Sequence, residues 1–345
     1  MRKLEYILTR QDGPLSVRRV MKERLHLSAK EISHAKHFTD GMRAVLKLNL
    51  GGEDRRRLHK EIFTNACREE GRADKIRFNA QDLPSETEVQ VRVNEILYPG
   101  ETLTVTLHEM EDDRGRIIPV PGSIDILYED EDLILLNKPA GIVSHPSPGH
   151  TDDSLSNHLA WYFENANEPH RIRIIGRLDK EASGVLLFAK TRMAAAALKQ
   201  EGAYDKEYLA VCEAFFSREE ESGTIRFPIR KRPEVILKRE ISEDGEPAIT
   251  HYRVLEQGHN RALVRLKLET GRTHQIRVHM AAIGHPLVGD RIYHPDGKAQ
   301  CARAMLHAEK MHIKHPLSGK ELIFTAPIPK DMQALIKDML NSQKQ

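Results

Sequence analysis

The segment Ile174–Lys190, with the sequence IIGRLDKEASGVLLFAK, places a carboxylate in a short charged loop directly before an apolar strand. Val185–Phe188 is an unbroken apolar run of strand length. Gly176 and Gly184 bracket the loop, where glycine permits a tight turn or a close backbone approach. Asp179 is therefore predicted at the mouth of a strand, a common position for a catalytic group on a rigid scaffold. From these residues alone, an aspartate that caps a helix or a turn is an equally good interpretation.

The segment Leu268–Asp290, with the sequence LETGRTHQIRVHMAAIGHPLVGD, is a second dense motif. Thr270–Gly271 predicts a turn, and Thr273 predicts the N-cap of a helix that runs to Ile283. Gly284 then predicts the end of that helix. The motif therefore predicts a turn followed by a short helix that carries several ionisable side chains.

Two histidines in this predicted helix raise the question of a metal site. His274 and His279 are five residues apart, whereas a helical pair of metal ligands is spaced by four. Asp290 is the acidic partner nearby, and no cysteine accompanies it. The spacing therefore predicts that no metal is bound here.

Together the two motifs resemble the RluA-like family of RNA pseudouridine synthases. The first follows that family's pattern of Arg-Leu-Asp, then Thr/Ser-Ser-Gly, then a strand that ends in Ala-Lys, here Arg177–Asp179, Ser183–Gly184 and Ala189–Lys190. The second follows the family's Thr-Gly-Arg-Thr-His-Gln-Ile/Leu-Arg-Val-His pattern at residues 270–279. Gly176 stands where histidine is frequent in the family, and Ala182 stands where threonine is. The resemblance spans residues 123–330.

The resemblance implies a role for each of three residues. Asp179 is similar to the catalytic carboxylate, Arg277 to its ion-pair partner, and Tyr208 to the ring that packs against the target base. It also implies substrate contacts, in which Arg177 fills the gap left by a flipped base or holds its phosphate. The full set of implied substrate-binding residues is Arg177, Lys206, Ile276, Arg272 and His274.

The pairing of Asp179 with Arg277 is physically reasonable for this reaction. Burial alone would raise the pKa of the carboxyl group, whereas an arginine within roughly 4–6 Å lowers it by about 1–3 units. Arginine also stays protonated and can bind both carboxylate oxygens at once. Such a pair would keep a carboxylate ionised in a nearly dry pocket.

Positive charge is concentrated on both sides of the first motif, although the formal net charge of the chain is only +2. Residues 226–239 hold six basic side chains against Glu234 alone, and residues 171–192 hold six against two acidic ones. Such concentration around a carboxylate suits a polyanion such as structured RNA, although a single run is usually a solvated face. The predicted contacts to the RNA backbone are Arg230, Lys231, Arg232, Lys238 and Arg239.

The N-terminal part, residues 1–110, is predicted to be a separate small domain. A helical pattern at 15–25, a second helix capped by Ser28, a strand at 89–93 and a final strand at 102–107 resemble an S4-like RNA-binding domain, a small α/β unit. An insert at about 42–87, with a possible helix around residues 58–66, interrupts this pattern. Residues 111–122 are polar and marked by proline and glycine, which predicts a linker.

Residues 123–345 are predicted to form the catalytic domain. Strands are expected at 124–128, 133–137, 185–188, 206–212, 223–229, 248–255, 263–268, 304–308 and 322–326, and helices at 155–163, 193–200, 273–283 and 330–340. This order predicts an α+β fold with a mixed, mostly antiparallel sheet, which agrees with the pseudouridine synthase fold that the resemblance implies. The family-type segment Lys138–Gly141 is expected to brace the Asp179 loop, and His145 to be a structural partner there.

Composition excludes several other classes of protein. The chain of 345 residues has no apolar run long enough to span a membrane and no apolar signal core at its start. Its three cysteines are far apart, which predicts neither disulfides nor a zinc site and favours the reducing cytoplasm. No nucleotide-binding fingerprint is present, and the reaction needs no cofactor. The lack of a long amphipathic seam predicts a monomer.

The function predicted from the sequence is isomerisation of specific uridines in ribosomal or transfer RNA. One alternative is a catalytically silent RNA-binding protein of the same fold, although an unused carboxylate and arginine would be a costly pair to keep. Another is a hydrolase that uses two carboxylates. Glu181 is the nearest second acid, and it is expected to point away from Asp179.

Overall fold

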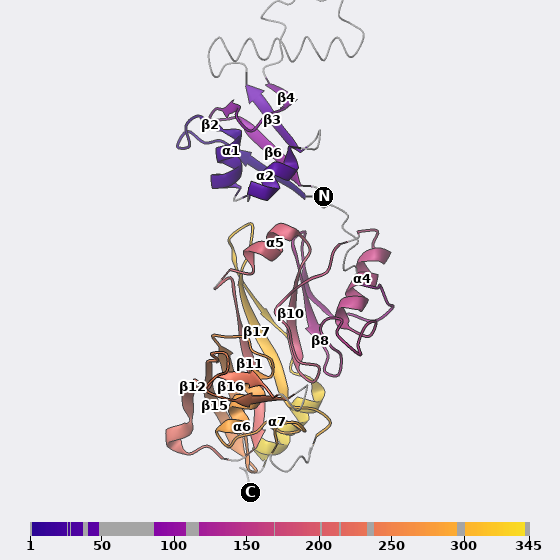
Figure 1. Ribbon diagram of the computed structural model, residues 1–345, viewed down its shortest axis with the longest axis vertical. Coiled ribbons are helices and arrows are strands. Elements are labelled where there is room, and N and C mark those ends of the chain that lie inside the picture. The colour runs from indigo at the N-terminus through magenta and orange to yellow at the C-terminus, as the bar shows by residue number, and fades with distance from the viewer. Residues whose placement is uncertain are drawn as a thin grey trace, which may run out of the picture. The chain divides into compact units, whose positions relative to one another are not determined.

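A computed structural model of the chain forms two compact units, Met1–Glu111 and Asp112–Gln345 (Figure 1). Within the described part of the chain, no helix is long and apolar enough to cross a membrane. The residues that the structure describes are 2–25, 27, 29–36, 41–47, 86–107, 117–168, 170–200, 202–213, 215–232, 238–294 and 301–341.

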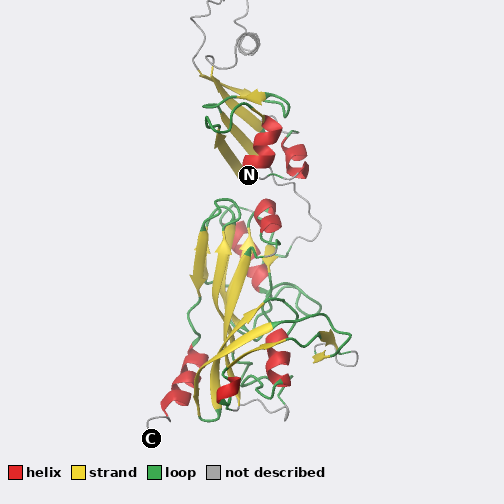
Figure 2. Cartoon of the chain, turned by 90° about the vertical axis from the view of Figure 1, so that its left-hand side faces the viewer, coloured by secondary structure: helices red, strands yellow, loops and turns green. Residues whose placement is uncertain are grey.

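The first unit contains an antiparallel sheet in the order β1 (Arg2–Ile7), β6 (Thr102–Leu107), β3 (Met42–Lys47) and β4 (Glu86–Gln90). A second, two-stranded ladder pairs β2 (Leu15–Ser16) with β5 (Ile96–Leu97). The helical segments are α1 (Val17–Arg19), which continues as the π-helical turn η1 (Val20–Arg24), and α2 (Ala29–Ala35). The helices lie against one face of the sheet (Figure 2). Val17, Val20 and Met21 are fully buried there, because the apolar side chains of this segment recur at helical spacing.

The insert predicted at 42–87 is too long at both ends. Its first six residues form β3, in which Met42, Ala44 and Leu46 alternate as buried residues, and its last residues begin β4, which pairs with β3. The segment was missed because an Asp-Gly turn was expected to lead straight out of the sheet. Ser28, the helix expected around 58–66 and linker residues 111–116 lie outside the described residues.

The second unit is built on a ten-stranded sheet among the described residues, in the order β12-β15-β16-β11-β17-β10-β8-β7, with β18 beside β17 and β9 beside β10. The pair β10–β17 is parallel, and the other pairs described in this sheet are antiparallel, as the fold prediction expected. The strands are β7 (Ile126–Glu129), β8 (Leu133–Lys138), β9 (Arg173–Ile175), β10 (Ser183–Ala189), β11 (Tyr204–Glu213), β12 (Ser222–Ile225), β15 (Thr250–Gly258), β16 (Arg261–Leu268), β17 (Leu306–Lys314) and β18 (Glu321–Thr325).

Helices cover both faces of this sheet, so its central strands are buried on both sides. They are α4 (Leu155–Asn165), α5 (Arg192–Ala197), α6 (Gln275–Ala282) and α7 (Lys330–Asn341), with a 3-10 turn η2 (Arg218–Glu220). Alternate residues of β10 enter different cores: Leu186 and Phe188 pack with α4, whereas Val185 and Leu187 pack with α5. The unbroken apolar run predicted from sequence is therefore a strand between two cores.

Gly184 fixes the parallel pair. It is aligned with Ala308 of β17, and a Cβ at this position would lie 2.1 Å from the Ala308 carbonyl oxygen. Its φ of +113° is also unfavourable for other residues. The Ser-Gly pair of the first motif thus lets two strands meet directly behind the Asp179 loop.

Two predicted elements differ in detail. The strand expected at 223–229 is split into β12 and β13 (Ile229–Lys231), because Pro228 has no N–H group to continue a ladder. β13 instead pairs with β14 (Arg239–Ile241) as a separate two-stranded hairpin. The predicted cap at Thr273 is wrong: the N-cap of α6 is His274, in a left-handed conformation with φ +59° and no side-chain cap.

Candidate active site

The Asp179 loop connects β9 with β10, and buried polar contacts hold its backbone. The Ser144 hydroxyl donates to the Leu178 carbonyl oxygen at 2.8 Å and accepts the Leu178 N–H at 3.2 Å. The Ala182 N–H donates to the Asp179 carbonyl oxygen at 3.1 Å. The side chain of Leu178 is buried in the core, whereas that of Asp179 keeps 21% of its surface exposed. The carboxylate is therefore rigidly presented but accessible.

The segment Lys138–Gly141 braces this loop, as predicted. The Gly141 N–H donates to the Lys180 carbonyl oxygen at 2.8 Å. The fully buried Lys138 ammonium donates to the carbonyl oxygens of Pro139, Ile142 and Lys180 at 2.8, 2.7 and 3.3 Å. Burial lowers the pKa of Lys138 to about 7, and the charge of Asp179 opposes that shift. Lys138 therefore ties three backbone carbonyl groups together beneath the loop.

Arg277 contacts three carboxylates, and Asp179 is the most distant of them. Its Nε and Nη2 atoms each lie 2.7 Å from an oxygen of the fully buried Asp290. Its Nη2 also lies 3.3 Å from Glu181, and its Nη1 lies 3.9 Å from Asp179. The predicted pairing with Asp179 is thus present as a longer contact, while the bidentate partner of Arg277 is Asp290.

Arg277 remains protonated in this environment. Burial would lower its pKa, but the hydrogen bonds and charge of Asp290, together with the charges of Asp179 and Glu181, raise it above the ordinary value. Because Asp290 fixes two of its nitrogens, Nη1 remains directed to Asp179. Arg277 is therefore an immobile cation beside the exposed carboxylate.

Glu181 was expected to point away from Asp179, but its side chain instead turns toward Arg277, the cation that also contacts Asp179. Its carboxylate accepts the Ala304 N–H at 3.2 Å in addition to the Arg277 contact. Arg303 donates to the Glu181 carbonyl oxygen at 3.2 Å and is itself held by Asp331 at 2.7 Å. Glu181 is thus tied to the segment before β17, which accounts for its orientation.

Tyr208 lies on β11, where a β-bulge between Glu207 and Tyr208 shifts the pairing with β17. The bulge aligns Tyr208 with Ala308, the same residue that faces Gly184 across the parallel pair. The ring is 7% exposed and belongs to the same core cluster as Leu178. Burial raises the pKa of the Tyr208 hydroxyl, and the charge of Asp179 raises it further, so that the phenol is neutral at physiological pH. Bulges commonly re-aim a side chain at a functional site.

Lys206 is two residues before Tyr208 and is 8% exposed. Its Nζ lies 5.8 Å from the centre of the Tyr204 ring, and among the described residues it has no hydrogen-bond acceptor or acidic partner. Gly176 leaves space for both side chains: a Cβ there would lie 2.9 Å from the Tyr204 hydroxyl and 3.3 Å from Lys206 Nζ. The family-typical histidine at this position would require the ends of these two side chains to shift.

Burial lowers the pKa of Lys206 from 10.5 to about 8. The folded protein therefore bears a penalty for the charged ammonium that is complete below pH 8 and disappears as pH rises to about 10.5. We expect Lys206→Met to stabilise the protein by about 1–3 kcal/mol at pH 7, because the stem remains packed and the charge is gone. Urea unfolding at pH 7 and pH 10 measures this gain, which should be much smaller at pH 10.

Lys199→Met removes an exposed lysine charge and is the matched control, with little expected effect at either pH. A loss of stability in Lys206→Met at pH 7 would show that the ammonium has a stabilising partner. A gain in stability accompanied by a loss of turnover is typical of a charge kept for function.

The other predicted substrate-binding residues lie near the site but differ in accessibility. Ile276 is 4% exposed and packs in the same core cluster as Tyr208. His274 shares a 2.9 Å hydrogen bond between its Nδ1 atom and the Tyr293 hydroxyl.

The two predicted arginine contacts lie at the surface. Arg272 pairs there with Glu246. Arg177 is exposed, and the structure shows no ionic partner for it among the described residues.

The predicted RNA-backbone residues lie on the β13–β14 hairpin and are less free than the sequence indicated. Arg230 forms ion pairs with Glu240 and Asp244, both at 2.8 Å. Glu240 also lies 3.9 Å from Arg232. These acids follow the basic run directly in sequence and fold back onto it. Lys231 is exposed, and Lys238 lies 5.9 Å from the Tyr293 ring.

The nitrogens of His279 are committed to structural hydrogen bonds. Its Nε2 donates to the Phe227 carbonyl oxygen, which fixes Nδ1 as the acceptor of the Thr250 hydroxyl, both at 2.9 Å. His274 and His279 are therefore not directed at a common point as metal ligands would be.

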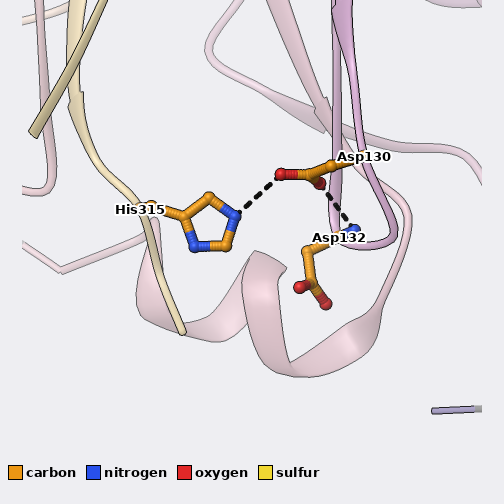
Figure 3. A group of neighbouring side chains, drawn as sticks. All are labelled: Asp130, Asp132 and His315. Carbon is orange, nitrogen blue, oxygen red and sulfur yellow. Dashed lines mark hydrogen bonds and ion pairs between the residues drawn. The ribbon is translucent and has the colours of Figure 1, made fainter. Parts of the chain in front are cut away.

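One group with metal-like spacing occurs among the described residues, Asp130, Asp132 and His315 (Figure 3). The His315 Nδ1 atom accepts the N–H groups of Leu317 and Ser318, so its Nε2 atom carries the proton that it donates to Asp130 at 2.9 Å. Asp130 Oδ1 also accepts the N–H groups of Asp132 and Leu133. This arrangement ties the β7–β8 turn to the end of β17 and offers no free imidazole nitrogen.

Sequence reasoning did not predict the contacts that three residues make in the site: Lys138, Glu181 and Asp290. Asp290 had a usable signal, because an arginine predicted to be buried requires a carboxylate and Asp290 ends the same motif. Glu181 and Lys138 had no such signal, because their contacts join segments far apart in the sequence.

Comparison with known proteins agrees with this geometry. The RNA pseudouridylate synthase family matches residues 132–282. An uncharacterized RNA pseudouridine synthase of Bacillus subtilis, YhcT, is 37% identical over 249 residues, covering 71% of this chain and 81% of the relative. The chain belongs to the RNA pseudouridylate synthase family. Ribosomal large subunit pseudouridine synthase D of Escherichia coli K12, another relative, is 38% identical over 251 residues, covering 68% of this chain and 76% of the relative.

Solved structures of RNA pseudouridylate synthase family proteins share the fold. Human RNA pseudouridylate synthase domain containing 4 matches with a TM-score of 0.52 at 22% identity, over 62% of this chain and 92% of its own. Human RNA pseudouridylate synthase domain containing 1 matches with a TM-score of 0.50 at 28% identity, over 64% and 97%. The catalytic unit therefore has the pseudouridine synthase fold, and the family is one of isomerases.

Proposed function

We propose that this protein isomerises specific uridines in ribosomal or transfer RNA to pseudouridine, with Asp179 as the catalytic carboxylate. The observation that carries the proposal is the placement of Asp179, a partly exposed carboxylate that lies beside the fixed cation Arg277 and close enough to Tyr208 to raise the pKa of its phenol. Ribosomal RNA is favoured by the relative named as a large-subunit enzyme.

The reaction breaks the N1–C1′ bond, turns the uracil and joins C5 to C1′, while C5 loses a proton and N1 gains one. Asp179 acts at the sugar, either by attack on C1′ or by removal of a ribose proton. Arg277 places a fixed positive charge beside that carboxylate. Tyr208 packs against the detached base and takes part in removal of the C5 proton.

The target uridine must leave its helix before it can reach Asp179. Flipping a base costs about a few kcal/mol, which contacts to the vacated position can offset. Arg177 is exposed, lies two residues before Asp179 and has no described ionic partner, so it is suited to fill the gap or bind the flipped phosphate. Lys206, with its unpaired ammonium, is suited to bind a second anionic group next to Tyr204.

The N-terminal unit is proposed to be an S4-like RNA-binding domain. Its helical segment buries Val17 and Met21 and exposes the basic side chains of Arg18 and Lys22. The three widely spaced cysteines favour a reducing compartment, so we place the protein in the cytoplasm. We propose that it acts as a monomer. The reaction as written needs no cofactor.

The β13–β14 hairpin is proposed to bind the RNA backbone. We expect the triple change Lys231→Ala, Arg232→Ala and Lys238→Ala to reduce the slope of log Kd against log salt by about 2, since each lost phosphate contact removes about 0.7–0.9. Filter binding over a range of potassium chloride concentrations measures the slope.

The control changes three exposed lysines outside the hairpin, at the end of β17, just before β18 and on α7: Lys314→Ala, Lys320→Ala and Lys337→Ala. It alters the net charge equally, so a general charge effect would appear in both variants. An unchanged slope in the hairpin variant would mean that RNA does not contact the hairpin.

The proposed reaction is tested with transcripts that carry tritium at C5 of uridine. A synthase releases tritium to water and no free uracil, because the detached base never leaves. A glycoside hydrolase would release uracil and leave the C5 label in place. An RNA-binding protein without activity would bind the transcript and release neither.

A further inference from the structure

The Tyr293 hydroxyl joins two parts of the catalytic unit. It accepts the backbone N–H of Arg239, on β14, at 2.9 Å. It also lies 2.9 Å from Nδ1 of His274, at the start of α6. Because the hydroxyl already accepts the Arg239 N–H, its own proton is available for Nδ1, and burial lowers the pKa of His274 and so favours the neutral ring. We assign the hydroxyl as the donor to Nδ1, with the His274 proton on Nε2.

Tyr293 is fixed against the catalytic arginine by its ring and by its backbone. The ring centre lies 5.3 Å from the Arg277 guanidinium carbon, within the range of a cation–π contact. Asp290, which binds Arg277, also accepts the N–H groups of Ile292 and Tyr293 at 3.0 and 3.2 Å. Any movement of Tyr293 would therefore disturb the Arg277–Asp290 pair.

The β13–β14 hairpin also contacts α6 through an apolar cluster. Ile229, the first residue of β13, is 3% exposed and packs with Val278 of α6, and Tyr293 packs against this cluster. The hairpin thus reaches α6 through an apolar contact and through the Tyr293 hydroxyl. Of these two connections, only the hydroxyl is a directional hydrogen bond to a titratable group, His274. Burial lowers the pKa of His274, and the nearby charge of Asp179 opposes that shift.

We infer that Tyr293 is a positioning residue that couples RNA held on the β13–β14 hairpin to the orientation of Arg277 and His274 beside Asp179. The inference rests on the proposed function, because it requires that the hairpin binds the substrate. RNA that displaces β14 would move the Arg239 N–H, and the hydroxyl would carry that displacement to His274.

The test is Tyr293→Phe, which keeps the ring over Arg277 and removes only the hydroxyl. Tyr162→Phe is the matched control, because the Tyr162 hydroxyl donates a 2.9 Å hydrogen bond to Glu129 away from this network. We expect the single-turnover rate at saturating RNA to fall about tenfold in Tyr293→Phe, through the loss of two hydrogen bonds. The Kd for RNA should change by less than about threefold, since the phosphate contacts remain.

A second readout follows the His274 imidazole by nitrogen NMR. The hydroxyl stabilises the neutral ring, so its removal should raise the pKa of His274 and mix the two tautomers. A general loss of stability would not move this titration, and Tyr162→Phe should leave it unchanged.

A normal rate at saturating RNA in Tyr293→Phe would overturn the coupling, and so would a defect confined to Kd. An unmoved His274 titration would overturn the hydrogen bond on which it depends. If the wild-type protein converts no uridine, the proposed function fails and the coupling falls with it. An active wild type beside a fully active Tyr293→Phe variant contradicts the coupling alone.

Discussion

Asp179→Asn should lower pseudouridine formation by at least about 10³-fold, because the amide can neither act as a base nor attack the sugar as a carboxylate does. RNA affinity should stay within about threefold, since binding depends on phosphate contacts elsewhere. Stability should also change little, because Arg277 keeps its bidentate partner Asp290. Tritium release, RNA binding and thermal unfolding of the same preparation measure the three effects.

The matched control is Asp152→Asn, which removes the same charge from an exposed position. It should retain full activity. Substantial turnover in Asp179→Asn would refute the role of this carboxylate and direct attention to Glu181, the other partly exposed acid at Arg277. Loss of RNA binding together with activity would show that the charge matters for folding or affinity.

Arg277→Met should abolish activity and destabilise the protein by about 3–5 kcal/mol, because it leaves the fully buried Asp290 without its counter-ion. The lost activity has a different cause, namely the absence of a fixed cation beside Asp179. Urea unfolding and single-turnover rates measure the two effects separately.

The double variant Arg277→Met with Asp290→Asn separates these causes. The asparagine oxygen can still accept the N–H groups of Ile292 and Tyr293, and no buried charge is left unpaired. We expect most of the stability to return while activity stays absent. Recovered activity would mean that Arg277 acts only through the fold, and an unchanged melting curve in Arg277→Met would contradict the buried pair.

Local patterns were sufficient to predict the framework of the catalytic unit. The apolar run that became β10 is confirmed as a central strand, and Leu155–Asn165 is helical where its pattern indicated. β3 was missed because its alternation is only six residues long and follows a turn signal. Pro228 divided an expected strand, although a proline inside a strand pattern is itself a warning.

The site was harder to predict, because its contacts join distant segments. Sequence motifs brought Asp179, Tyr208 and Arg277 into one hypothesis, but they could not assign which carboxylate binds Arg277 most closely. The run at 226–239 was predicted to be a basic surface, whereas Glu240 and Asp244, which follow that run in sequence, pair with Arg230. Such pairings depend on how the chain folds back, which residue spacing does not encode.

The measurement that tests the central claim most directly is a pseudouridine map of total RNA from cells that lack this gene, complemented with the wild type or with Asp179→Asn. We predict that one or a few uridines lose their modification in the absence of the gene and regain it with the wild type alone. Sites restored equally well by Asp179→Asn would contradict the catalytic role of Asp179. A map that is unchanged under all conditions, together with no tritium release by the purified protein, would contradict the synthase assignment itself.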